Sequence, residues 1–176
     1  MYKVTLITNL KEQEKLLDWV PENVDIVDIP IQREIHLMSD LKVLFILIRF
    51  FYKSHFSLIH SVSPKAGLLA MLASYVAMVP VRLHTFTGQV WSTRRGFKRG
   101  LLRWLDWLID LLATTVLIDS HSQRDYLIKN KVVSASSSIV LGEGSISGVD
   151  LNRFKVDLIA RNKIRRELVV LDSTVV

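Results

Sequence analysis

The chain contains no cysteine among its 176 residues. This absence excludes disulfide scaffolds, zinc sites built on thiolates, and cysteine nucleophiles. Long apolar runs are absent too, because the longest stretch without a charged residue, Ala66–Val81, is interrupted by Pro80. A membrane-spanning helix needs about 18–20 apolar residues, and the apolar run at the N-terminus is too short for a secretion signal. We therefore expect a cytoplasmic protein that is at most peripheral to a membrane.

Glycine and histidine motifs are also scarce. The first apolar run is followed by Thr8, Asn9, Leu10 and Lys11, with no glycine, which disfavours a dinucleotide fingerprint or a Walker motif at that turn. No Gly-x-Ser-x-Gly elbow follows a predicted strand, so a serine triad has no support. The five histidines lack metal-ligand spacing. The residues alone therefore predict no metal site and assign no catalytic residue.

The chain is apolar and basic at once: 49% of its residues are hydrophobic, its net charge is +6, and its mean hydropathy is +0.28. That composition excludes a disordered chain and suggests a membrane surface or nucleic acid as partner. The excess charge is local, since residues 94–110 and residues 151–176 each contribute +3. No nucleic-acid-binding module is visible around these segments. We predict no nucleic-acid partner.

Short apolar runs alternate with helical patterns along most of the chain. The predicted strands are Val4–Thr8, Val24–Ile29, Ser57–Val62, Val79–Phe86, Thr115–Asp119, Ser138–Leu141 and, at the end, Leu168–Leu171. The predicted helices are Lys11–Val20, Asp40–Lys53, Ser63–Met78, Phe97–Ala113, Ser120–Asn130 and Asp157–Glu167. This order predicts an α/β fold: a Rossmann-like, doubly wound, mostly parallel sheet with helices on both faces. Ligands of such sheets bind beyond the carboxyl ends of the strands.

The predicted helix Phe97–Ala113 is apolar around most of its circumference. Basic residues that lead into a tryptophan-rich helix are typical of an element that lies on anionic lipid. A buried helix with a basic entry turn remains the alternative. Asp106 and Asp110 share a face with Arg99 and Arg103, and we interpret them as a solvated, ion-paired stripe rather than a catalytic pair. The predicted membrane surface consists of Arg94, Arg95, Lys98, Arg99, Trp104 and Trp107.

Three segments carry a family likeness: Ser61–Ala70, which contains Ser-Pro-Lys-Ala-Gly, His84–Trp91, and Leu141–Phe154, which contains Gly-Ser-x-x-Gly-Val-Asp. Together they resemble the N-terminal half of family 4 glycosyltransferases, above all the bacterial enzymes that build capsular, exopolysaccharide or other lipid-linked glycans. The resemblance implies one half of a GT-B fold, in which two Rossmann-like domains face each other across a cleft. It also implies retaining transfer, no obligatory metal and no cofactor, with a nucleotide-sugar co-substrate bound mainly by the second domain.

The resemblance also assigns roles to residues at strand ends. The helix that opens at Ser63 turns its first amides and the Lys65 cation toward the cleft, where they can hold an anion. The alternative for each position is a purely structural role in a helix cap or a loop. Thr87 occupies a position where relatives often have histidine. The implied substrate-binding residues are Ser63, Pro64, Lys65, Gly67, His84, Thr87, Gly88 and Gln89, and the implied hinge and cleft loop comprises Gly142, Gly144, Ser145, Gly148 and Asp150.

We therefore predict an acceptor-side domain over residues 1–150, and over residues 151–176 a crossing segment and the start of a nucleotide-sugar-binding domain in cis. The family's donor-binding lysine and paired glutamates do not occur before Val176. On this hypothesis the domain receives a polyprenyl diphosphate-linked saccharide at the inner face of the cytoplasmic membrane. The 176-residue chain alone transfers no sugar, and its exposed cleft drives self-association. The alternatives are a non-catalytic membrane-surface or partner-binding module built on Arg94–Leu112, and a small nucleotide-binding protein.

Overall fold

A computed structural model describes residues 2–12, 20–32, 34, 36–145 and 150–170. The chain divides into two compact units, residues 1–145 and residues 146–176. The predicted boundary after residue 150 lies just beyond this division. The assignment of the second unit to a nucleotide-sugar-binding domain stays a prediction.

The first unit begins with a small parallel sheet. Strands β1 (Val4–Thr8) and β2 (Val24–Asp28) pair in register from Val4 opposite Val24 to Thr8 opposite Asp28. Both strands are predicted by their β-branched, apolar sequence. Of the predicted helix Lys11–Val20, the structure describes a 3-10 turn, η1 (Leu10–Glu12), while residues 13–19 lie outside the described residues.

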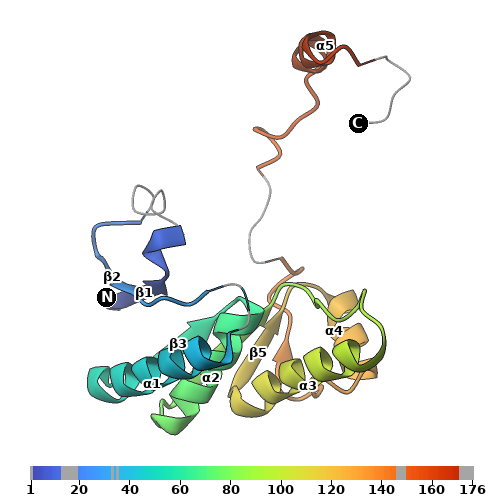
Figure 1. Ribbon diagram of the computed structural model, residues 1–176. Coiled ribbons are helices and arrows are strands. Elements are labelled where there is room, and N and C mark those ends of the chain that lie inside the picture. Colours follow the sequence, from blue (N-terminus) through green and yellow to red (C-terminus); the bar gives the residue numbers. More distant parts are fainter. Residues whose placement is uncertain (1, 13–19, 33, 35, 146–149, 171–176) are drawn as a thin grey trace. The chain divides into compact units, whose positions relative to one another are not determined.

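A second parallel sheet contains β3 (Leu58–Ser61), β4 (Val81–Phe86), β5 (Thr115–Ile118) and β6 (Ser138–Ile139), in that order. The connecting helices are α2 (Pro64–Val76), α3 (Gly96–Leu112) and α4 (His121–Lys129). Helix α1 (Leu37–Ser54) precedes β3 and packs on α2, which packs in turn on α3 (Figure 1). The α/β fold with parallel strands and crossover helices is confirmed, and among the described residues its six strands form two hydrogen-bonded sheets.

Strand register explains which side of the larger sheet is buried. Ser61 pairs with His84 and His84 with Val116, so these side chains point to the same face, and all three are buried. Right-handed crossovers between sequential neighbours place α2, α3 and α4 on one face. On the opposite face Leu58 and Val81 are about half exposed. The core therefore lies between the sheet and the helical row.

Local signals fix the helix ends. Ser63 is the residue before α2, and Pro64 occupies its first turn, where a missing N–H costs nothing. The hydroxyl of Ser120 accepts a hydrogen bond from the Gln123 amide and caps α4. After α1, His55 adopts a left-handed conformation that ends the helix. The sequence predicts each of these helices to within a few residues.

The second unit contains α5 (Leu158–Glu167), as predicted. The carboxylate of Asp157 accepts hydrogen bonds from the amides of Ile159 and Ala160 and caps this helix. The predicted strand Leu168–Leu171 is wrong over residues 168–170, because Leu168 and Val169 form a turn and Val170 is in no strand. Val169 has a φ of +53° there, and the amide of Val170 bonds the carbonyl of Arg165. Apolar composition predicts a strand only where a neighbour supplies a ladder, and here the backbone closes a helix C-terminus instead.

Candidate functional site

The loops that follow β4, β5 and β6 are joined by hydrogen bonds at the carboxyl edge of the larger sheet. The side-chain amide of Gln123, on α4, donates to Gln89 Oε1 at 3.4 Å, and its oxygen accepts from the Asp119 amide at 3.2 Å. The amide of Ser145 donates to the Asp119 carbonyl at 2.6 Å. The structure thus brings the predicted residues Gln89 and Ser145 to one network around Asp119.

Three side-chain atoms at strand ends are buried and have no hydrogen-bond partner within the described part of the chain: Asn9 Oδ1, Gln89 Nε2 and Asp119 Oδ1. They follow β1, β4 and β5 respectively. Buried polar atoms are paired in the great majority of cases, so each such exception calls for a partner. Asp119 is a candidate site residue that the assignment from the family resemblance does not include, although its place directly after a buried strand is the signal that points to it.

The first turn of α2 presents its backbone at the same edge. Ser63 and Pro64 are exposed, and the Gly67 amide bonds the Ser63 carbonyl at 2.6 Å. Lys65 is not the free cation that the sequence predicts. Its ammonium lies 2.6 Å from Asp40 of α1 and also donates to the backbone carbonyl of Glu34. The physical reason is a contact between residues far apart in the sequence. The packing of α1 on α2 places the Asp40 carboxylate beside Lys65, and this carboxylate neutralises the charge of the lysine.

Gly67 and His84 lie beneath α2, where they hold its first turn on the sheet. A Cβ on Gly67 would stand 2.5 Å from His84 Cε1, so only glycine lets the helix approach this closely. His84 is 1% exposed and its Nδ1 lies 2.8 Å from Ser61 Oγ. Burial lowers the pKa of His84 to about 4, with a smaller contribution from nearby His60. The imidazole is therefore neutral at physiological pH, and in this structure it positions α2 from inside the core.

Thr87 and Gly88 are exposed, and a Cβ on Gly88 would meet nothing within 4 Å. The loop that holds them is anchored by Trp91, whose indole N–H donates to Asp106 Oδ2 at 2.7 Å. Trp91 is buried and stacks on Tyr126 of α4 at 5.4 Å between ring centroids. Trp91 thereby ties the candidate site to both α3 and α4.

The carboxylates of α3 face inward, which corrects the prediction of a solvated, ion-paired stripe. Asp106 is 7% exposed, and burial raises its pKa to about 6, partly offset by the hydrogen bond from Trp91. Asp110 accepts from the Ser137 hydroxyl at 3.0 Å, and burial raises its pKa as well. Packing reversed the expected orientation, since a charged pair four residues apart marks one face of a helix without saying which face is covered.

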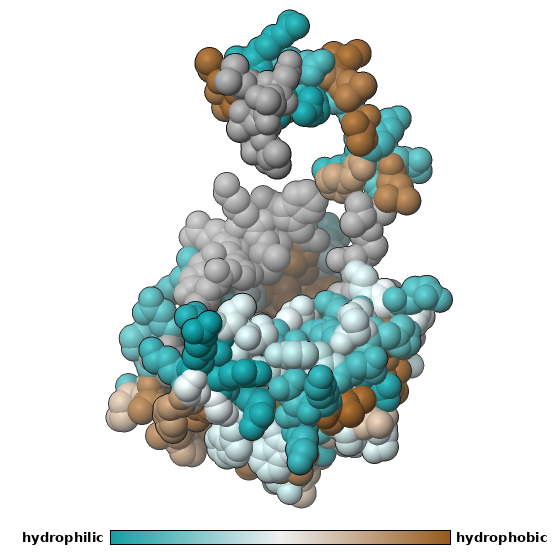
Figure 2. Space-filling model, turned by 90° about the vertical axis from the view of Figure 1, so that its right-hand side faces the viewer, coloured by the Kyte–Doolittle hydropathy of each residue, from teal (hydrophilic) through white to brown (hydrophobic). Residues whose placement is uncertain are grey.

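The predicted membrane surface is exposed in the structure. Arg94, Arg95, Lys98 and Arg99 are exposed, and the Arg99 guanidinium lies 5.8 Å from the Trp91 ring centroid. Phe97 is 84% exposed and Trp104 51%, so α3 is not the buried helix that the alternative described. Hydrophilic and hydrophobic side chains lie next to one another on the side that carries α3 and α4 (Figure 2). No helix among the described residues is both long enough and apolar enough to cross a bilayer.

The crossing loop after β6 relies on unusual backbone angles. Gly142, Gly144 and Ser145 have φ values of +53°, +99° and +70°. A Cβ on Gly144 would collide with the Asp119 carbonyl oxygen, so this glycine permits the close approach of the two loops. The predicted residue Gly148 lies outside the described residues. Asp150, in the second unit, accepts hydrogen bonds from the amides of the two residues that follow Leu151.

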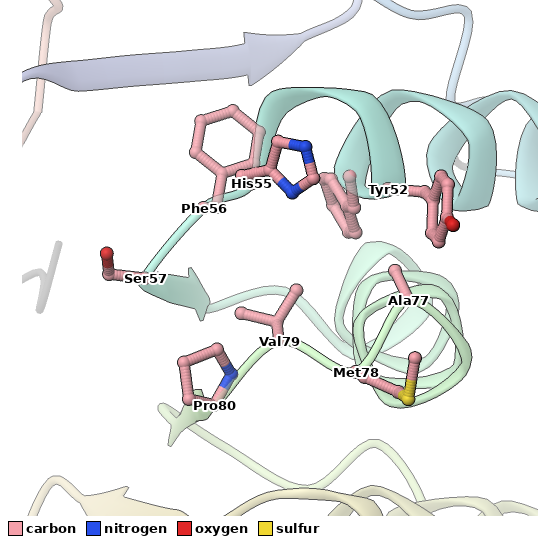
Figure 3. A pocket seen from close by; sticks show the side chains of 9 residues that line it. Tyr52, His55, Phe56, Ser57, Ala77, Met78, Val79 and Pro80 are labelled. Carbon is pink, nitrogen blue, oxygen red and sulfur yellow. The ribbon is translucent and has the colours of Figure 1, made fainter.

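A pocket of about 370 Å³ lies at the other edge of the larger sheet, where the chain enters β3 and β4 (Figure 3). Tyr52, His55 and Phe56 line one side, and Ala77 to Pro80 line the other. Its walls combine apolar side chains with polar groups, and it is at the amino edge, where parallel α/β folds rarely hold substrate. Within the described residues no three histidine or carboxylate side chains gather in a way that could hold a metal.

Comparisons with known proteins agree with this fold. Residues 2–142 match the glycosyl transferase 4-like domain family. The chain is 33% identical over 129 residues to the capsular polysaccharide biosynthesis glycosyltransferase CapM of Staphylococcus aureus, a match that covers 73% of this chain and 34% of that protein. It is 31% identical over 147 residues to the UDP-Gal:alpha-D-GlcNAc-diphosphoundecaprenol alpha-1,3-galactosyltransferase of Escherichia coli, covering 82% of this chain and 37% of that one.

Among solved structures, the chain is similar to Anabaena HepE in complex with UDP and glucose, with a TM-score of 0.63 at 15% identity. That match covers 96% of this chain and 50% of HepE. It supports the GT-B half at the level of fold. The chain spans about a third of the length of the two curated relatives. On the match over residues 2–142, the chain belongs to the glycosyl transferase 4-like domain family.

Proposed function

We propose that this chain is the acceptor-binding domain of a retaining glycosyltransferase in surface polysaccharide biosynthesis. The reaction moves a sugar from a nucleotide-sugar to a saccharide carried on a polyprenyl diphosphate. The observation that carries the proposal is a pair of buried polar atoms, Gln89 Nε2 and Asp119 Oδ1, that have no hydrogen-bond partner within the described residues and follow strands at the carboxyl edge of the sheet. The name of the Escherichia coli relative, which specifies a diphosphoundecaprenol-linked acceptor, supports the same substrate class.

Each part of this edge suits one part of such an acceptor. The amide end of α2 carries a positive partial charge that favours an anionic diphosphate. The Lys65–Asp40 ion pair holds that helix end in place, and the two charges of the pair cancel each other. The Gln89 amide can donate to a sugar oxygen, and the Asp119 carboxylate can accept from a sugar hydroxyl. The edge therefore offers complementary groups for both the phosphate and the saccharide.

The surface of α3 supports a location on the inner face of the cytoplasmic membrane. An acceptor with a polyprenyl chain stays in the bilayer, so the domain that receives it must come to the lipid surface. The exposed side chains of Arg94, Arg95, Lys98 and Arg99 stand beside Phe97 and the indoles of α3. Cations near an anionic surface contribute about 1 kcal/mol each, and aromatic side chains prefer the interface.

The nucleotide-sugar is assigned to a second domain in cis, as the family resemblance implies, and no other cofactor is needed. The retaining outcome rests on that resemblance as well. We accordingly expect the 176-residue chain to bind acceptor without turning over a nucleotide-sugar.

Calorimetric titration of the chain with a short-chain prenyl diphosphate-linked N-acetylhexosamine tests the proposal. We expect saturable binding that Asp119→Asn and Gln89→Ala each weaken about tenfold, the size of one lost hydrogen bond to a charged or buried group. Asp125→Asn is the matched control, because Asp125 is an exposed carboxylate on α4. Binding of UDP-sugars with no binding of the acceptor analogue would contradict the proposal and favour a nucleotide-binding protein.

The exposed α3 surface also favours a second candidate, a non-catalytic membrane-surface or partner-binding module. Such a module needs only residues 94–112 and makes no use of the carboxyl edge. Vesicle binding without any acceptor binding in the titration would favour it. Acceptor binding that is sensitive to Asp119→Asn would exclude it.

A further inference from the structure

Helix α1 has exposed apolar side chains on its outward side. The sequence alone does not reveal this side, because the centre of the helix is a continuous apolar run. Its buried residues, Val43, Leu47 and Phe51, are four apart and mark the side that faces the core. At 100° per residue the opposite side holds Leu41, Phe45 and Tyr52, which are 49%, 64% and 62% exposed. The outward face of α1 therefore carries exposed apolar and aromatic side chains along three turns, interspersed with the exposed cations Lys42 and Arg49.

Helix α3 repeats this arrangement on the other side of α2. Asp106, Ile109 and Leu112 face inward. The opposite side presents Trp104 and Leu111, 51% and 60% exposed, in line with the highly exposed Phe97. Between the two helices lies α2, whose ionic side chain is Lys65 in its first turn. The helical row thus presents two apolar ridges beside an almost uncharged helix.

The charges of α1 and α3 are sorted by sign. Their carboxylates are Asp40, Asp106 and Asp110, and each has an inward partner: Lys65, Trp91 and Ser137. The cations of the same helices are all exposed, and they are Lys42, Arg49, Lys53, Lys98, Arg99 and Arg103. Every exposed ionic side chain on α1, α2 and α3 is therefore positive.

A hollow of about 590 Å³ lies where α3 meets the end of α4. Its walls contain two indoles and three cations and no carboxylate. Within the described chain no ion pair involves any of these cations. The lining residues are Gly100, Arg103, Trp104, Trp107, Lys129, Asn130 and Lys131. Such a hollow fits a single phosphate-bearing group flanked by apolar chains.

We propose that the outer face of α1, α2 and α3 is a docking surface for an anionic phospholipid bilayer, with the α3–α4 hollow as a headgroup site. This inference rests on the proposed function and extends the predicted α3 contact to α1. Two apolar ridges enter the interface, while the exposed arginines and lysines meet lipid phosphates. The uniform positive sign and the aromatic tips complement a negatively charged interface. The occupant is therefore lipid, and a soluble polyanion is an outcome of the test.

Docking through this face has a geometric consequence for the acceptor. Helices α2 and α3 run antiparallel to the strands that they connect, so they lie along the bilayer with the carboxyl edge of the sheet at one end. The start of α2 then lies beside the lipid surface. A diphosphate that emerges from the headgroup layer can reach it without leaving the membrane.

The absence of cysteine allows a direct test with single-cysteine variants. An environment-sensitive fluorophore is placed at Phe45→Cys on α1, at Trp104→Cys on α3, and at Ala135→Cys, an exposed loop position before β6. With phosphatidylglycerol vesicles that contain brominated lipid, we expect blue shifts and quenching at positions 45 and 104 and none at 135. A response at 104 alone overturns the α1 contact and leaves the proposed function intact. The same response to heparin as to vesicles overturns the lipid assignment.

A charge-matched pair of variants measures the electrostatic part. Lys42, Arg49 and Lys53 are changed together to Gln, and so are Lys155, Arg161 and Lys163, an equal set of exposed cations in the second unit. We expect about fivefold weaker vesicle partitioning for each α1 cation removed. Equal losses in the two triple variants overturn the proposal, because only net charge would then matter. Acceptor binding by calorimetry, measured on the same variants without lipid, shows separately whether the proposed function holds.

Discussion

Helices α2 and α3 are neighbours on the same face of one sheet, yet they differ in how closely they pack on it. A Cβ on Gly67 of α2 would collide with His84 of the sheet, whereas a Cβ on Gly100 of α3 would meet nothing within 4 Å. Helix α2 is buried over most of its length, while α3 buries its carboxylates and exposes its arginines. The difference is that α2 packs closely on the sheet, whereas α3 presents an exposed side of cations and aromatic rings.

The largest expected effect comes from adding side-chain volume to α2. Gly67→Val places carbons against the buried His84 ring and forces the helix off the sheet, which we expect to cost about 3 kcal/mol of unfolding free energy. Urea denaturation measures this cost. Gly100→Ala is the matched control in α3, where added helix propensity should stabilise by up to about 1 kcal/mol. Equal effects of the two substitutions would contradict the distinction between the helices.

The next effect comes from the inward carboxylate of α3. Asp106→Ala leaves the buried Trp91 N–H without an acceptor, and we expect a loss of about 2 kcal/mol. Asp106→Asn keeps a side-chain oxygen at that position and should cost less. Thermal unfolding of both variants near neutral pH checks the order. An alanine variant as stable as the asparagine variant would show that the Trp91 hydrogen bond does not hold the loop.

The pH dependence of stability distinguishes the inward carboxylate of α3 from His84, which lies in β4 beneath α2. The raised pKa of Asp106, about 6, contributes stability that is lost as pH rises from 3.8 through 6. The lowered pKa of His84, about 4, acts in the opposite sense, because stability is lost as pH falls from 6.5 through 4. The two slopes oppose each other between these values. Asp106→Asn removes one of them, so relative to the unmodified chain it should gain about 1 kcal/mol between pH 5 and 6.5. A constant difference across that range would contradict the burial of this carboxylate.

The smallest stability effect is expected at the exposed face of α3. Trp104→Ser should change unfolding free energy by no more than about 0.5 kcal/mol, since the indole is half exposed. Partitioning onto anionic vesicles should nevertheless fall several-fold. A large loss of stability without a loss of vesicle binding would assign Trp104 to the core.

The sequence predicted most helices and strands, because helix caps and apolar runs depend only on neighbouring residues. The Ser63-Pro64 pair predicts the start of α2, and the alternation of apolar runs predicts six strands close to their observed bounds. The pairing of Lys65 with Asp40 could not be predicted, because it depends on how α1 packs on α2. The inward orientation of Asp106 depends on packing in the same way. The apolar run Val43–Ile48 hides the outward face of α1, since only packing decides which residues of a continuous run are covered.

The candidate site was predicted in outline and not in detail. Strand ends predicted where ligands would bind, and Gln89 lies there with a buried amide nitrogen that has no hydrogen-bond partner within the described chain. The family resemblance assigns Gly67 and His84 to substrate binding. In the structure the two residues contact each other where α2 packs on the sheet, and they hold the first turn of α2 in position. Asp119 follows β5, and its buried oxygen makes it a candidate that the resemblance did not supply.

The central claim is that the carboxyl edge receives a diphosphate-linked saccharide acceptor. Amide chemical shifts of the isotopically labelled chain, followed during titration with a prenyl diphosphate-linked sugar, test it residue by residue. We predict saturable shifts at Ser63, at Thr87 to Gln89 and at Asp119. Shifts confined to the pocket between Tyr52 and Met78, or shifts produced only by a UDP-sugar, would contradict it.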